Sequence, residues 1–136
     1  MVKIAQNPYY TIKVDEGKNR ILLNICGGWG GETEVSHYLE HWDLALRLVQ
    51  PGFTILSDIR EAKEHSPEVR WLHLEAQRKT LNAGLAHVAE VHRLNESGSD
   101  YAIDMAQESK IPLNIFDNVA DAEAWLEEIV QEKKRK

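Results

Sequence analysis

Strand-like and helix-like segments alternate along the whole chain. Two β-branched and aromatic runs, 9–14 and 20–25, flank a turn at 15–19 and predict an antiparallel hairpin. Further strands are expected at 53–56, 85–91 and 112–116, and helices at 32–49, 67–82, 101–108 and from 118 onward. The order ββαβαβαβα requires crossover connections, which favour parallel pairing. The sequence therefore predicts an α/β fold with a mostly parallel five-stranded sheet and an antiparallel hairpin at its N-terminal edge.

Length and charge limit the classes of protein that fit. The 136 residues suit a single domain over 1–136. Sixteen Lys and Arg against 22 Asp and Glu give a net charge of −6, and four of the basic residues stand at 133–136. The acidic body disfavours nucleic-acid binding. The basic tail is expected to complement the negative end of the last helix, with contact to an anionic membrane surface as the alternative.

Cysteine content and hydropathy indicate the compartment. Cys26 is the single cysteine, which excludes an intrachain disulfide and a multi-cysteine zinc site and fits a reducing environment. The first residues lack the apolar core of a signal peptide, and no apolar run is long enough to span a membrane. We therefore expect a cytoplasmic protein.

His37 and His41 form an H-x-x-E-H pattern, the zinc motif of one class of protease. On a helical wheel both histidines lie opposite the apolar stripe of Val35, Leu39, Trp42, Leu46 and Val49, and so point into solvent. A catalytic zinc also needs a third ligand and an enclosing cleft, and the sequence offers no obvious element for either. The sequence therefore predicts no metal and no cofactor.

The glycine-rich run 27–31 surrounds Trp29. It lacks the Gly-Lys-Ser/Thr ending of a phosphate loop, and Glu32 and Glu34 at the start of the next helix would repel a phosphate. We interpret the glycines as a sharp strand-to-helix turn. Trp29 is then either a lid packed over the core or an exposed anchor.

The helix from Pro67 has apolar residues on two sides. One stripe contains Val69, Leu72, Ala76 and Thr80, and the other side carries Trp71, Leu74 and Leu81. Such a helix fits between a sheet and a neighbouring helix. Alternatively, the second side is an exposed apolar patch for homodimerisation, a protein partner or a membrane surface.

Polar residues gather after the third expected strand, where open α/β sheets bind ligands. They are Asp58, Arg60, Glu64, His65 and Ser66. Ser66 precedes Pro67 and is interpreted as a helix cap. A hydrolase using Asp58, His65 and Ser66 is the alternative, although the nucleophile motif G-x-S-x-G is missing.

Three stretches resemble the STAS superfamily. They are 23–29 followed by 34–48 (strand, glycine turn and first helix), 53–58 (an apolar strand ending in Asp) and 115–126, with its F-x-x-x-x-x-A-x-x-W-L pattern. The likeness spans nearly the full chain and is greatest to the SpoIIAA-like branch, which is related in structure to CRAL-TRIO lipid carriers. It implies a SpoIIAA-like fold.

The resemblance also implies a non-enzymatic, bacterial-type regulatory or binding domain. The expected ligand is a small apolar molecule or lipid, with a membrane surface or a protein partner as alternatives. The residues predicted to line or cover the ligand site are Trp29, Trp71, Leu74, Leu81 and Tyr101. Tyr101 belongs to a short helix with Ile103 and Met105, which could move as pocket-covering helices do.

In phosphorylated STAS proteins a serine caps the helix after the third strand. Ser66, eight residues beyond Asp58, resembles that position and would make the protein an anti-sigma-factor antagonist switched by phosphorylation. The local sequence His65-Ser66-Pro67-Glu68 departs from the Asp-Ser-Ser/Thr-Gly pattern of the family. Glu64 and Glu68 would also oppose a phosphate.

Overall fold

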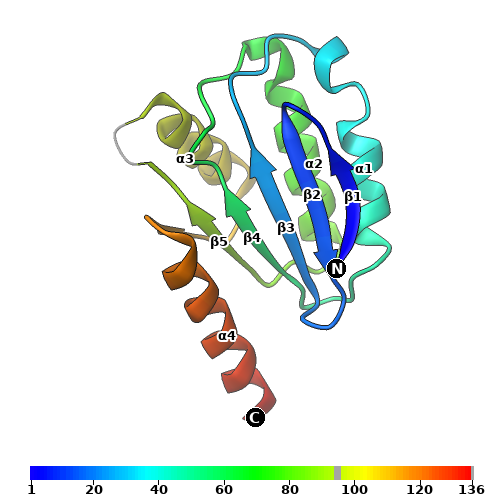
Figure 1. The fold of residues 1–136 in the computed structure, drawn as a ribbon, viewed down its shortest axis with the longest axis vertical. Helices are drawn as coiled ribbons and strands as arrows, with labels where there is room; N and C mark the ends of the chain where they lie inside the picture. The colour runs from blue at the N-terminus through cyan, green and yellow to red at the C-terminus, as the bar shows by residue number, and fades with distance from the viewer. Residues whose placement is uncertain (94–95, 136) are drawn as a thin grey trace.

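The computed structural model describes residues 1–93 and 96–135 (Figure 1). Its centre is a sheet whose strands lie side by side in chain order. The strands are β1 (Val2–Gln6), β2 (Tyr10–Asp15), β3 (Arg20–Ile25), β4 (Thr54–Asp58), β5 (His87–Val91) and β6 (Leu113–Phe116). β1, β2 and β3 pair antiparallel, and β3 to β6 pair parallel. The predicted α/β class, with a mostly parallel sheet and an antiparallel N-terminal edge, is confirmed.

The sheet has six strands, and the prediction of five was wrong because it missed β1. This edge strand pairs only with β2, and its register shifts between Lys3 and Ala5. Ala5 is its only buried residue. A strand that buries so little carries no clear alternation of apolar and polar residues, and alternation is the signal by which a strand is recognised.

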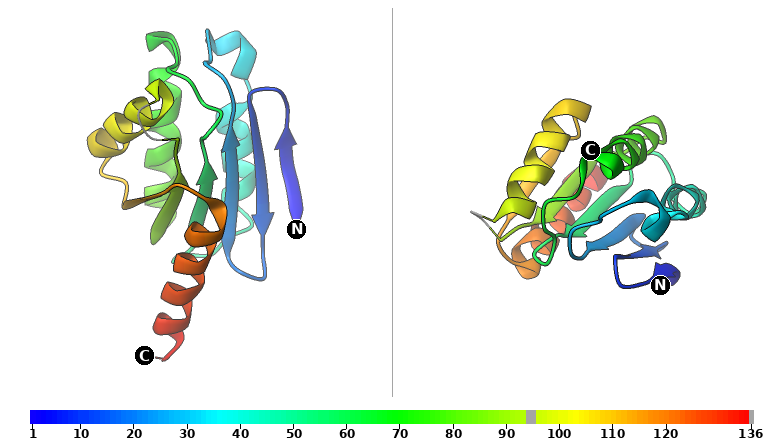
Figure 2. Two further views of the ribbon diagram at one scale, coloured as in Figure 1. Left: turned by 60° about the vertical axis from the view of Figure 1, so that its left-hand side comes forward. Right: turned by 90° about the horizontal axis from the view of Figure 1, so that it is seen from above.

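Helices cover the two faces of the sheet unequally (Figures 1 and 2). The α-helices are α1 (Tyr38–Leu46), α2 (Arg70–Asn82), α3 (Ser97–Ser109) and α4 (Val119–Arg135), and short 3-10 turns, Glu32–Val35 and Pro67–Val69, precede α1 and α2. α1 packs on β1 and β2 and against α2, which in turn contacts α3. α4 packs on β4, β5 and β6 from the other side.

Because successive side chains of a strand point to opposite faces of the sheet, each face has a hydrophobic core of its own. Ile55 and Val88 point to the side of α1 and α2, whereas Leu56 and Ala89 join Leu126 of α4 on the other side.

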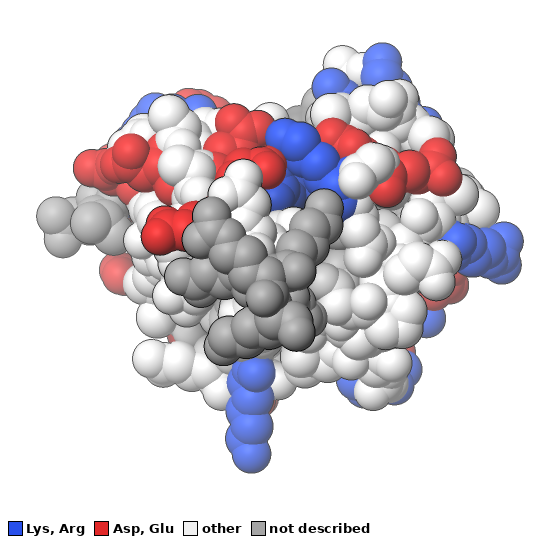
Figure 3. Space-filling view, turned by 90° about the horizontal axis from the view of Figure 1, so that it is seen from below, with Lys and Arg blue, Asp and Glu red and all other residues white. Residues whose placement is uncertain are grey.

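No helix among the described residues is long and apolar enough to cross a membrane. Seen from below, acidic and basic side chains are interspersed on the described part of the surface, not gathered into one basic patch (Figure 3).

The apolar face of α1 differs from the predicted one. Val35, Trp42 and Val49 of the predicted stripe are buried, and Leu39 and Leu46 are partly buried and pack against the same core. The prediction left out Tyr38 and Ala45, which are buried more deeply than the two leucines, so the buried face of α1 is centred to one side of the predicted one.

The two histidines of this segment differ in exposure. His37 is 67% exposed, as predicted, but His41 is half-buried, with Nδ1 2.6 Å from the Tyr10 hydroxyl. The prediction that both point into solvent was therefore wrong for His41. Among the described residues, no group of three or more His, Cys, Asp or Glu side chains is placed to hold a metal ion.

Candidate functional site

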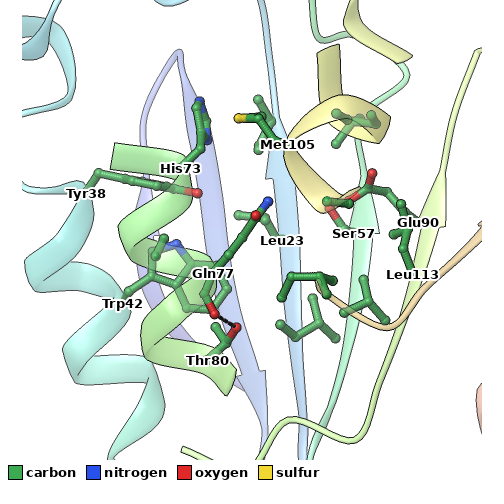
Figure 4. A pocket seen from close by; sticks show the side chains of 18 residues that line it. Leu23, Tyr38, Trp42, Ser57, His73, Gln77, Thr80, Glu90, Met105 and Leu113 are labelled. Carbon is green, nitrogen blue, oxygen red and sulfur yellow. Dashed lines mark hydrogen bonds between the residues drawn. The ribbon is translucent and has the colours of Figure 1, made fainter. Parts of the chain in front are cut away.

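An internal cavity of about 70 Å³ lies between the sheet and the helices of its more covered face (Figure 4). Its walls come from β3, β4, β5, β6, α1, α2 and α3. Most lining side chains are apolar, among them Leu23, Ile55 and Met105. The cavity thus lies at the junction of the first three α-helices with the parallel part of the sheet.

Register and alternation place two polar strand residues in this cavity. Ser57 of β4 pairs with Glu90 of β5, so the two lie side by side on one face (Figure 4). α2 contributes His73, Gln77 and Thr80 from successive turns. The cavity therefore has an apolar wall interrupted by a few convergent polar groups, the composition typical of small-molecule sites.

Two polar atoms of the residues that line the cavity have no hydrogen-bond partner among the described residues. They are Nε1 of Trp42, whose residue is 2% exposed, and Oγ of Ser57, whose residue is 1% exposed. A buried polar atom left unpaired costs about 1–3 kcal/mol, so most proteins pair such atoms. Because Trp42 and Ser57 both line the cavity, these two groups are the candidates for hydrogen bonds with an occupant.

Glu90 connects the cavity to the start of α3. Oε1 of Glu90 is 2.7 Å from His92 Nε2, and His92 Nδ1 is 2.7 Å from Oγ of Ser99. In neutral His92, the Nε2–H donates to the carboxylate and Nδ1 accepts from the Ser99 hydroxyl. His92 and Ser99 are 1% and 3% exposed, so this chain of hydrogen bonds is internal.

Trp29 is a lid over the core and not an exposed anchor. It is fully buried, and its Nε1–H donates to the Tyr9 carbonyl at 3.2 Å. Its ring stacks against His65 and His73, with ring centroids 4.7 and 4.6 Å away. Tyr38 meets the indole edge-on at 4.8 Å. Trp29 therefore holds together the glycine turn, α1 and α2 next to the cavity.

His65 and His73 form a hydrogen-bonded neutral pair. His65 Nε2 is 3.0 Å from the Gly27 carbonyl, which can only accept, so this nitrogen carries the proton. His65 Nδ1 then accepts from His73 Nε2–H at 2.7 Å. Burial lowers the pKa of His65 to about 4. Burial, together with His65 and Arg70, lowers the pKa of His73 to about 3.

The predicted hydrolase residues have separate hydrogen-bond partners. Asp58 pairs with Arg60 at 2.8 Å, and these bonds hold the pKa of Asp58 below its usual value although burial acts to raise it. Ser66 Oγ donates to the Gly30 carbonyl at 3.0 Å, whereas His65 bonds to His73. The described hydrogen bonds thus do not join Ser66, His65 and Asp58 into a triad.

Ser66 does occupy the N-cap position, with φ −66° and ψ 152°, but its side chain makes no cap hydrogen bond. The interpretation of Ser66 as a side-chain cap was therefore wrong in its chemistry. The hydroxyl instead fastens the start of the helix to the glycine turn, because the Gly30 carbonyl lies within its reach. Sequence patterns for caps consider only the helix itself and miss such tertiary acceptors.

The remaining predicted site residues lie around the cavity, not in its wall. Trp71 is 49% exposed and its Nε1–H donates to Glu32, and Leu74 and Leu81 are half-buried. Tyr101 lies 5.4 Å from His65 by ring centroids, with its hydroxyl buried and unpaired among the described residues.

His65, Ser66 and Tyr101 share a separate, open depression with Arg70. Of the nine predicted site residues, none belongs to the described lining of the internal cavity. Met105, which the sequence analysis placed on a pocket-covering helix, does line the cavity. Sequence reasoning missed the polar cavity residues, although Ser57 and Glu90 gave a signal: each is a polar residue at an inward position of a strand.

The comparisons with known proteins bear on the fold. No protein-family model and no curated protein sequence matches the chain. The structure is similar to that of a DUF3478 family protein with a SpoIIAA-like fold from Shewanella loihica PV-4, with a TM-score of 0.65. The two chains are 16% identical, and the match covers 90% of this chain and 97% of the other. The resemblance noted in the sequence is thereby confirmed at the level of architecture: this chain has a SpoIIAA-like fold.

Proposed function

We propose that this protein is a non-enzymatic binding domain that holds a small molecule in the internal cavity. The observation that carries the proposal is the pair of buried, unpaired groups, Trp42 Nε1 and Ser57 Oγ, in the cavity wall. A ligand with an oxygen atom would accept from the Trp42 N–H and exchange a hydrogen bond with Ser57. Its carbon atoms would contact the apolar remainder of the wall.

The cavity volume restricts the ligand to a small molecule or a small terminal group. A cavity of about 150 Å³ holds benzene, so about 70 Å³ corresponds to a fragment of about three or four non-hydrogen atoms. At a ceiling of about −1.5 kcal/mol per atom, such a fragment reaches a Kd between about 0.5 and 0.04 mM at best. A long acyl chain exceeds this volume, and mass spectrometry of the intact purified protein tests directly for bound lipid.

The indole N–H resonance of Trp42 reports on the cavity directly. We expect 2-propanol at millimolar concentration to shift this resonance, assigned by its loss in Trp42→Phe. The Trp29 N–H, already bonded to the Tyr9 carbonyl, is the internal control and should stay in place. Ser57→Ala should weaken binding, because it removes the hydroxyl from the wall. If saturating 2-propanol leaves the Trp42 resonance unmoved, the proposal fails.

Binding to a membrane surface or a protein partner and phosphorylation at Ser66 remain predictions of the resemblance, and binding to a second copy of the chain remains a prediction from the apolar side of α2. The exposed Trp71 is where the first three would be sought. Phosphate on Ser66 would replace the hydrogen bond from its hydroxyl to Gly30. Treatment with a cognate kinase followed by mass spectrometry tests the switch.

A further inference from the structure

We infer that the cavity selects a ligand that combines an N–H donor with an oxygen acceptor, as a primary carboxamide does, and rejects carboxylates. This inference rests on the proposed function and concerns the chemical class of the ligand. It follows from the charges and hydrogen-bonding groups around the cavity, taken element by element.

Glu90 is the only residue with a formal charge at neutral pH among the described lining residues. Its side chain is 15% exposed. α1 contributes Tyr38 and Trp42, and α2 contributes Gln77, Thr80 and the neutral His73. The α3 and β6 residues of the wall are apolar. No Lys or Arg belongs to the described wall, so no cation is there to neutralise an anionic ligand.

A carboxylate ligand would therefore lose its hydration next to another carboxylate. Two like charges close together in a poorly hydrated site repel strongly. His92 Nε2 occupies one oxygen of Glu90 and is not among the described residues of the cavity wall. The remaining acceptor capacity of the Glu90 carboxylate favours a donor group instead.

Trp42 imposes the complementary requirement. Its indole nitrogen is a donor only, so the ligand needs an acceptor on the side of α1. Trp42 and Glu90 come from α1 and β5, on different sides of the cavity (Figure 4). Ser57, beside Glu90, can donate or accept. A carboxamide offers both kinds of partner, an oxygen acceptor of the kind Trp42 requires and an N–H donor of the kind Glu90 favours.

Acetamide and acetate form a matched pair of probes, because they share one shape and the same number of non-hydrogen atoms and differ in charge and in the N–H donors. We expect acetamide to shift the Trp42 indole resonance at a concentration about tenfold lower than acetate does. 2-Propanol serves as the neutral reference. Equal binding of acetamide and acetate, or a preference for acetate, overturns the inference, while a response to 2-propanol leaves the proposed function standing.

The variant Glu90→Gln tests the assigned residue. Glutamine retains an oxygen that can accept from His92 Nε2–H, so the internal hydrogen bonds can persist. The preference for acetamide should shrink by several-fold in this variant. Glu61→Gln is the matched control, because Glu61 is exposed, 67% by side chain, and pairs with Arg93 outside the cavity. An undiminished preference for acetamide in Glu90→Gln refutes the role of Glu90. The comparison of acetamide with acetate in the unaltered protein does not depend on whether that variant folds.

Discussion

His65 Nδ1 accepts a hydrogen bond from His73 Nε2 at 2.7 Å, and both rings stack on the buried Trp29. The bond requires a neutral His65, since a proton on its Nδ1 would face the N–H of His73. Burial reinforces this requirement by lowering both pKa values. The contact between the loop before α2 and α2 itself therefore depends on pH.

We predict that the free energy of unfolding falls as the pH drops below about 6.5, the usual pKa of an unfolded histidine. The folded-state pKa values are about 4 for His65 and about 3 for His73. Below pH 6.5 the unfolded chain binds protons that the folded protein does not. Stability is therefore complete above that pH and is lost progressively toward pH 4 and then pH 3, by up to about 1.4 kcal/mol per pH unit for each histidine.

Urea unfolding at a series of pH values measures this effect. His73→Gln should reduce the slope between about pH 6 and pH 4 by up to about 1.4 kcal/mol per pH unit, because one group with a lowered pKa is gone. His37→Gln, which changes a histidine that is 67% exposed, should keep the original slope. A His73→Gln slope equal to that of the unaltered protein would refute the account.

Trp29 and Trp71 should differ sharply in their contribution to stability. Trp29→Ala removes a fully buried indole and should cost about 3–5 kcal/mol. Trp71→Ala removes an indole that is 49% exposed and should cost less than about 1 kcal/mol. Chemical denaturation of the two variants provides the comparison, and similar losses would show that Trp29 is not the closing element of the core.

Gly98 is required by a close contact at the start of α3. A Cβ atom there would lie 2.1 Å from the carbonyl oxygen of Ala62, so Gly98→Ala must push helix and loop apart. We expect a loss of about 1–3 kcal/mol in thermal or urea unfolding. Gly17→Ala is the control, because its Cβ would meet only Asp15 Oδ1, at 3.5 Å. Equal stability of the two variants would contradict the contact.

Arg20 anchors α4 to the sheet. This residue is 2% exposed and donates to Thr54 Oγ1 at 3.1 Å and to Glu127 Oε1 at 3.0 Å. Glu127→Ala should cost about 1–3 kcal/mol, because it leaves a buried guanidinium with an unpaired N–H. Lys18→Ala removes the other, exposed partner of Glu127 and should cost about 1 kcal/mol at most.

Hydrogen exchange across α4 should rise in Glu127→Ala and stay unchanged in Lys18→Ala. Faster exchange confined to the other helices would place the anchor of α4 elsewhere.

The fold could be predicted largely from local patterns. Strand β3 was predicted with its observed bounds, because its apolar residues and flanking turns are all local signals. The edge strand β1 was missed because only Ala5 of it is buried. The stripe of α1 was predicted at Trp42, but the burial of Tyr38 and Ala45 was missed because the prediction followed the spacing of the large aliphatic residues alone.

The cavity could not be predicted from local patterns, because it is formed by packing between elements distant in sequence. Trp42 and Glu90 are related only because α1 and β5, which are distant in sequence, border the same cavity. The tautomer of His65 likewise depends on the Gly27 carbonyl, 38 positions away. Composition identified Trp29 as unusual, but only the stacking histidines decide that it lies inside.

The attachment of α3 is uneven along its length. Its first turn is held by buried contacts, those of Gly98 with the Ala62 carbonyl and of Ser99 with His92. Further along, Arg70 reaches Asp104 and Glu108 from α2 through ion pairs open to water. Ser109 of its last turn also bonds to Gln77 of α2, and Met105 and Ala106 are buried in the cavity wall. A ligand larger than the cavity would therefore have to break the bond from Ser109 and expose Met105 before α3 could yield, while Gly98 and Ser99 kept the first turn attached.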